Sequence, residues 1–173
     1  MCGRYRTPDE KEIHPSEAAE VLFRNGKRRA HWGVKLSYGP LIINARSETA
    51  VSKPLFRNAM QKGRCIVEAS SFYEWDKNKR CHVFMPHESG TLYMAALMVP
   101  SNDGTERFVI LTQAAHGHAK DVHPRMPCLL PTAEYRQLWL QDDSLAPHLL
   151  NEVVPLDIQI AHMSNEQMDM FTS

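Results

Sequence analysis

The chain has 173 residues with 20 basic and 20 acidic side chains, so its formal net charge is zero. This balance excludes a protein that binds nucleic acid or membrane through its overall field, and any contact with a polyanion needs a local patch. No apolar run is long enough to cross a bilayer, and the polar start is unlike a signal peptide. We therefore expect a cytoplasmic protein, nucleoid-associated when engaged or nuclear in a eukaryote, without membrane contacts, and one domain over residues 1–173.

The first half of the chain predicts two helices and a short strand. HPSEAAEVLFRNG (14–26) has Pro and Ser at its start, apolar residues at helical spacing and Asn-Gly as a stop, which favours a helix. LIIN (41–44) is a short apolar strand after a Tyr-Gly-Pro turn. SKPLFRNAMQKG (52–63) is a second helix with an early proline and a closing glycine.

The middle of the chain is rich in strands separated by turn-like pieces such as DKNK, HESG and SNDG. The predicted strands are RCIVEA, SFYEW, CHVFMP, TLYMAALMV and RFVILTQ. PTAEYRQLWL (131–140) predicts a third helix with Thr132 near its N-cap, and VVPLDIQIAHM (153–163) predicts a last strand. The fold class that follows is α+β, with an antiparallel, barrel-like two-sheet core flanked by a few helices.

Four cysteines bear on the chemistry, namely Cys2, Cys65, Cys81 and Cys128. They form no C-x-x-C pair, so we expect no structural zinc. We also expect no other metal and no cofactor. Three of them lie in apolar stretches that predict core positions. Cys2 is either a tolerated residue of a frayed end or, once Met1 is removed, a terminal residue with its α-amine and thiol on adjacent carbons.

Two polar residues stand where catalytic sites are usually built, beside strands and turns. Asn44 ends a strand of Leu and Ile, where it either orients a neighbour through its amide or caps a turn. Glu74 lies among Phe72, Tyr73 and Trp75, and alternation places it on the face of Phe72. Such a carboxylate is either desolvated, with a raised pKa suited to acid/base catalysis, or exposed on an amphipathic strand.

His123 in DVHPRMP has a position restrained by Pro124 and Pro127, and a histidine can move protons near neutral pH. A histidine in such a context is more often a surface or structural residue. Arg4, Arg46 and Arg125 are candidates for phosphate contacts, with surface salt bridges as the alternative.

Five motifs in one order resemble the SRAP family, the SOS-response-associated peptidase domain of abasic-site-processing proteins. They are MCGRY, HWG, INARSET, RCIVEASSFYEW and VHPRMPCLL, and the resemblance runs from Met1 to about Leu140. It implies an enzyme that cross-links to abasic sites in single-stranded DNA and shields the lesion, with lyase and autoproteolytic activities. We expect it to act as a monomer.

The resemblance also implies a mechanism and roles for residues. Loss of Met1 exposes Cys2, whose amine forms a Schiff base with the ring-opened sugar and whose thiol closes a thiazolidine. Asn44 holds the amine and sugar, Glu74 shuttles protons, and His123 assists ring opening. Arg4, Arg46 and Arg125 grip phosphates, and Trp32 in HWG either stacks on a base or, as tryptophans more often do, lies in the core.

The chain departs from the family pattern at two places. RNGKRRAHWG joins the first predicted helix to the W-G motif without the Y-N-x-x-P stretch that members commonly carry, which bears on the shape of a DNA groove. Glu68 also stands where a proline or neutral residue is usual, and it is a weaker candidate carboxylate than Glu74. Rival functions are a non-catalytic reader of damaged or modified DNA, a cysteine-dependent peptidase, and an N-terminal nucleophile amidohydrolase.

Overall fold

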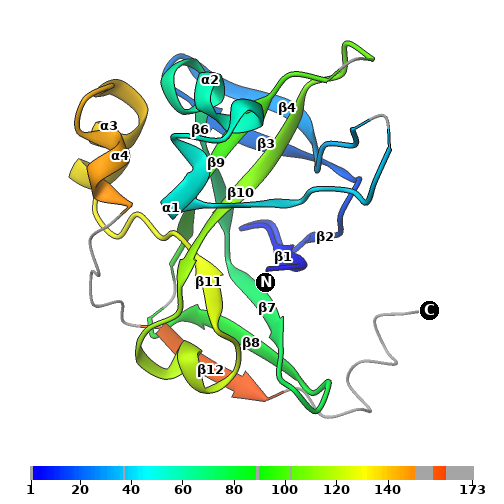
Figure 1. The fold of residues 1–173 in the computed structure, drawn as a ribbon. Coiled ribbons are helices and arrows are strands. Elements are labelled where there is room, and N and C mark those ends of the chain that lie inside the picture. Colours follow the sequence, from blue (N-terminus) through cyan, green and yellow to red (C-terminus); the bar gives the residue numbers. More distant parts are fainter. Residues whose placement is uncertain (1, 37, 89, 102, 151–157, 163–173) are drawn as a thin grey trace.

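The structure is a computed structural model that describes residues 2–36, 38–88, 90–101, 103–150 and 158–162 (Figure 1). One sheet, called the small sheet, has the strand order β12-β8-β7-β1-β2. Its strands are β1 (Arg4–Arg6), β2 (Glu12–Ile13), β7 (Ser71–Trp75), β8 (Cys81–Pro86) and β12 (Ile158–His162).

The second sheet, called the large sheet, has the order β11-β10-β4-β3-β6-β9, with β5 also paired to β10. Its strands are β3 (Ala18–Phe23), β4 (Gly26–Trp32), β5 (Asn44–Arg46), β6 (Arg64–Ala69), β9 (Leu92–Val99), β10 (Arg107–Ala114) and β11 (Arg125–Pro127). Because β9 pairs with β10 as well as with β6, five of these strands close into a ring. The predicted α+β class with two sheets is confirmed, although the ring is less regular than a barrel.

The helices of the described residues are short. They are α1 (Ser47–Ala50), α2 (Pro54–Lys62), α3 (Ala133–Gln141), α4 (Ala146–Leu149) and the 3₁₀ turn η1 (Gly117–Asp121). None of the helices in these ranges is long and apolar enough to cross a bilayer. The predicted helices at 52–63 and 131–140 are confirmed as α2 and α3, and the Thr132 side chain accepts a hydrogen bond from the Tyr135 N–H.

The prediction of a helix over 14–26 is wrong, because this segment forms β3 and the whole of its turn into β4. Ala19, Val21 and Phe23 are buried while Glu20 is exposed, which is the two-residue period of a strand. The sequence favours a helix here because Ala18, Val21 and Leu22 also fit one helical face. Arg24 and Asn25 form the turn of a hairpin in which Phe23 pairs with Gly26, so the Asn-Gly pair does not end a helix.

The other predicted strands differ mainly at their ends. The strand expected at 41–44 is displaced to β5, and Ile42 makes only an isolated bridge to Val34. β6 to β10 fall within one residue of the predicted segments. The last strand is confirmed as β12, while residues 153–157 and 163 of that prediction lie outside the described residues.

Alternation along the central strands divides the apolar side chains between two cores. On β10, Phe108 and Ile110 face the core between the sheets, whereas Val109 and Leu111 face the core beneath the helices. Helices α2 and α3 cover that second core, on the side of β6 and β9 away from β1 (Figure 1). Both faces of these strands are therefore buried, which explains their continuous apolar sequences.

A buried arginine joins the helices to the large sheet. Arg64 at the start of β6 donates to the carbonyls of Met60 and Trp139, each at 2.6 Å, and pairs with Asp143 at 2.5 Å. The Trp139 indole returns a hydrogen bond to the Cys65 carbonyl at 2.9 Å. A charge this deeply buried is tolerated because carbonyls and a carboxylate surround the guanidinium.

Gly33, directly after β4, has a conformation that only glycine adopts easily. Its φ is +103°, and a Cβ built there would lie 2.9 Å from Leu41 Cγ and 3.1 Å from Ile43 Cγ2. Its N–H donates to the Phe108 carbonyl at 2.7 Å. The absence of a side chain at Gly33 therefore lets Leu41 and Ile43, which lead into β5, pack directly against its backbone.

We expect Gly33→Ala to lower the free energy of unfolding by about 1–3 kcal/mol, from backbone strain and crowding together. Urea denaturation followed by circular dichroism measures this change. Gly90→Ala is the control, because a Cβ there meets only ordinary contacts at 3.8 Å or more. Equal stability of the two variants would contradict the strain.

Candidate functional site

Strand β10 positions the polar residues of the large sheet. Its second half pairs with β5 on one edge, where Ile110 faces Asn44, and with β11 on the other, where Ala114 faces Arg125. The turn before β11 carries His123, whose N–H donates to the Ala119 carbonyl of η1 at 3.0 Å. One strand thus brings together segments that lie about 80 residues apart in the sequence.

The small sheet supplies the other two predicted residues. β1 pairs with β7 through Arg4 and Tyr73, so Cys2, which precedes β1, enters close to the end of β7. Glu74 on β7 is 2% exposed and belongs to the inner face with Phe72, as the alternation predicted. Tyr73 belongs instead to a separate apolar cluster on the outer face.

Two contacts bring the sheets together at the site. Asn44 Nδ2 donates to the Cys2 carbonyl at 2.8 Å, and His123 Nδ1 lies 3.9 Å from Glu74 Oε2. The two pairs are neighbours, because the Glu74 carboxylate is close enough to raise the pKa of the Cys2 thiol. Cys2, Asn44, Glu74 and His123 therefore occupy one place between the sheets, although they come from four different segments.

Burial dominates the electrostatics of the site. Desolvation raises the pKa of Glu74 to about 7. Burial also raises the pKa of the Cys2 thiol well above its ordinary range, and the Glu74 carboxylate adds to this effect. Near neutral pH the carboxyl group is therefore close to half protonated, so it can either donate or accept a proton.

His123 is the more accessible member, with 26% of its side chain exposed. His123 Nδ1 lies 3.0 Å from both the backbone nitrogen and the carbonyl oxygen of Arg125, so the backbone of its own turn holds the ring. Desolvation lowers the pKa of His123, so the neutral ring is favoured near pH 7. The ring is thus oriented by its own turn and placed at the solvent side of Glu74.

Two residues predicted to contact DNA have other partners. Arg4 lies over the rings of Tyr73 and Trp75 and pairs with Glu12 at 3.0 Å, which places it on the outer face, away from Glu74. Trp32 is fully buried, and its Nε1–H donates to the Ile43 carbonyl at 2.9 Å. Since no part of its ring is exposed, Trp32 is a core residue in this structure, packed against Tyr5 and Phe108.

The other two predicted arginines lie beside the site. Arg46 is exposed at the end of β5, on the same face as Asn44. Arg125 makes a two-pronged ion pair with Glu48, at 2.5 and 2.9 Å, and also donates to the Thr112 carbonyl at 2.5 Å. Sequence reasoning missed Glu48 as a partner, although it stands inside the INARSET motif, only four residues after Asn44.

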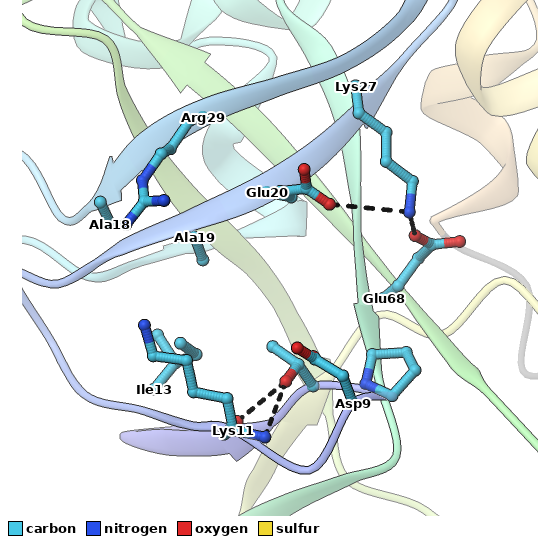
Figure 2. A pocket seen from close by; sticks show the side chains of 11 residues that line it. Asp9, Lys11, Ile13, Ala18, Ala19, Glu20, Lys27, Arg29 and Glu68 are labelled. Atoms are coloured by element: carbon cyan, nitrogen blue, oxygen red, sulfur yellow. Dashed lines mark hydrogen bonds and ion pairs between the residues drawn. The ribbon is translucent and has the colours of Figure 1, made fainter.

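A pocket of about 550 Å³ lies apart from this site, between the loop after β1 and strands β3 and β4 (Figure 2). Lys11 and Arg29 line one side of it, while Lys27 bridges to Glu20 and Glu68 on the other. Glu68 pairs with Lys27 at 2.8 Å and takes no part in the site. Among the described residues, no group of His, Cys, Asp or Glu side chains is arranged to hold a metal ion.

Comparison with known proteins identifies the family. Residues 11–168 match the family model described as SOS response associated peptidase (SRAP). The chain belongs to the SRAP family. The match extends past the point near Leu140 where the motif resemblance thins.

Several relatives in this family are named abasic site processing proteins. YoaM of Bacillus subtilis is 30% identical over 131 residues, which cover 71% of this chain and 57% of the relative. YobE of the same organism is 31% identical, covering 82% and 73%, and YedK of Escherichia coli is 32% identical, covering 82% and 66%. The chain thus spans somewhat over half the length of the first of these SRAP relatives.

Solved structures show the same fold. A protein from Bordetella bronchiseptica has a TM-score of 0.79 at 20% identity and covers 94% of this chain and all of its own. A protein from Bacteroides thetaiotaomicron has a TM-score of 0.78 at 19% identity, covering 91% of this chain and 79% of its own. At such identities the likeness concerns the fold alone.

Replacing Glu74 with Gln should stabilise the protein above neutral pH. An unfolded glutamate titrates near 4.3, whereas the folded-state pKa of Glu74 is about 7. The contribution of the protonated Glu74 carboxyl to the free energy of unfolding is therefore fully present below about pH 4, and it is lost as the pH rises through 7. The free energy of unfolding of Glu74→Gln, relative to wild type, should therefore increase by on the order of 1–3 kcal/mol from pH 5 to pH 8.

Urea denaturation of both proteins at the two pH values measures this difference. Glu106→Gln, which removes a half-exposed carboxylate, is the control and should show no comparable growth. A constant difference between Glu74→Gln and wild type would contradict a buried, titrating carboxyl group.

Proposed function

We propose that this SRAP protein captures abasic sites in single-stranded DNA through Cys2 after removal of Met1. The grouping of Cys2, Asn44, Glu74 and His123 between the two sheets is the observation that carries the proposal. The relatives YoaM and YedK are named abasic site processing proteins, which supports the same substrate class.

The chemistry needs an amine and a thiol on neighbouring carbons. The α-amine of Cys2 adds to the aldehyde carbon of the ring-opened sugar, and loss of one water gives an imine. The Cys2 sulfur then adds to the imine carbon while its proton passes to the nitrogen, which closes a five-membered thiazolidine. Ring closure is favoured because both groups belong to one residue and have a high effective concentration.

Glu74 is suited to move the protons in these steps. Its pKa of about 7 allows it to hold or release a proton near neutral pH, so it can accept the thiol proton as the sulfur attacks and pass it to the nitrogen. The thiol itself resists ionisation because it is buried, so a nearby base is needed to generate the nucleophile. Burial of the site also excludes water that would hydrolyse the imine.

Asn44 and His123 act on position and on the sugar. The Asn44 amide N–H already bonds the Cys2 carbonyl, and its Oδ1 has no hydrogen-bond partner among the described residues, so it is available to an amine or a hydroxyl group. His123, neutral and partly exposed, is placed to transfer a proton during ring opening of the sugar. The exposed Arg46 and the adjacent Arg125 stand where a phosphate would approach.

Cys2→Ser and Cys2→Ala should both abolish the stable adduct with a single-stranded oligonucleotide that contains one abasic site. Serine keeps the terminal amine but has no thiol to close the ring. A denaturing gel shows the adduct as a shifted band, and Cys128→Ala, which removes a thiol from the other core, should keep it. Absence of a shifted band with the wild type would overturn the proposal.

The same variants separate the rival functions. A non-catalytic reader would bind the oligonucleotide equally well without Cys2, and an amidohydrolase would release ammonia from glutamine. Peptidase activity without DNA would likewise be lost with Cys2 but would leave no shifted band.

Met1 must be absent from the active form, because an amide-bound Cys2 nitrogen cannot form an imine. Intact-mass spectrometry of the purified protein should show the loss of one methionine. A fraction that retains Met1 should not form the adduct, and cross-linking by that fraction would contradict a role for the Cys2 amine.

A further inference from the structure

The ion pair between Glu48 and Arg125 has the geometry that an arginine uses for a phosphate. Two guanidinium nitrogens of Arg125 contact the two Glu48 oxygens, at 2.5 and 2.9 Å. Arginine binds carboxylate and phosphate groups through the same pair of parallel N–H···O bonds. Glu48 thus occupies the fork that a DNA phosphate would need.

The two partners are held very differently. Arg125 is 15% exposed and also donates to the Thr112 carbonyl on β10. Glu48 is 47% exposed and lies on α1, which has only four residues. If the carboxylate moved away, the Thr112 contact would keep the guanidinium in position, so the arginine is prearranged while its partner is replaceable.

The pair also lies directly at the site. Arg125 donates through its backbone to His123 Nδ1, and Glu48 follows Asn44 and Arg46 on the same short segment. A guanidinium from β11 therefore reaches across β10, past Thr112, to the segment that carries Asn44. A phosphate exchanged into this position would flank the catalytic group.

We propose that Glu48 competes with a DNA phosphate for Arg125 and so lowers the affinity of the protein for undamaged single-stranded DNA. This inference rests on the proposed function, because it takes single-stranded DNA as the ligand. The competition makes Glu48 a specificity-determining residue. Intact DNA must displace the carboxylate for one phosphate contact, whereas an abasic strand also gains the reaction with Cys2.

Removal of the Glu48 charge should strengthen binding to DNA that cannot react. The probe is a fluorescent, intact single-stranded oligonucleotide, with binding measured by anisotropy at several salt concentrations. We expect Glu48→Gln to bind about five- to tenfold more tightly than wild type at low salt, since one charge-assisted contact no longer requires displacement. The slope of log affinity against log salt should steepen by up to about 0.7, the value for one additional phosphate.

Two further variants make the comparison specific. Glu106→Gln carries the same charge change at a matched exposure, 48% against 47%, but lies beyond the other end of β10 beside Arg28. It should change affinity little. Glu48→Gln combined with Arg125→Gln should lose the gain, and thermal unfolding of each variant establishes that it is folded.

The outcomes distinguish this inference from the proposed function. Unchanged or weaker binding by folded Glu48→Gln, or a gain that survives Arg125→Gln, would overturn the competition. Cross-linking of the wild type to abasic DNA is measured separately. If that adduct forms while Glu48→Gln gains nothing, the inference fails and the function stands, whereas a missing adduct counts against the function alone.

Discussion

The candidate site depends on the pairing of β10 with four other strands. The first half of β10 bonds to β4 and β9, and its second half bonds to β5 and β11. This change of partners halfway along the strand lets the segments of Asn44 and His123 reach the two edges of β10 near Thr112. A slip of one residue in either pairing would turn these side chains to the opposite face, so the ladder sets the chemistry as well as the fold.

Burial between the sheets raises the pKa of Glu74 and weakens the contribution of the candidate site to stability. Glu74 is enclosed with Cys2 and Phe72 on the inner face, and the same desolvation that raises its pKa disfavours its charged form. Such a cost is typical of functional sites, where a residue suited to proton transfer replaces one suited to packing. The apolar side chains buried in the two cores on either side of the large sheet offset this free-energy cost.

The arginines show how little charge alone predicts about DNA contact. Arg4 and Arg64 are both basic residues of the first half of the chain, yet one is ion-paired on the outer face and the other is buried beneath the helices. Arg46 and Arg125, by contrast, lie next to Asn44 and His123 because β5 and β11 border the same strand. A charged side chain becomes a candidate for phosphate binding through its place in the sheet.

Motif order and local alternation in the sequence determined most of the secondary structure of the central strands and the face on which Glu74 lies. They predicted the α+β class, strands β6 to β10, helices α2 and α3, and the inward face of Glu74, because these depend on periodicity and on residues close in the chain. They failed for 14–26, where the apolar residues fit both a helix and a strand, and the hairpin with β4 decided between them. Only the tertiary structure decided that Asn44 contacts Cys2, that Glu48 pairs with Arg125 and that Trp32 is buried. Each of these contacts joins segments far apart in the chain, and local pattern carries no information about which distant strand edges will pair.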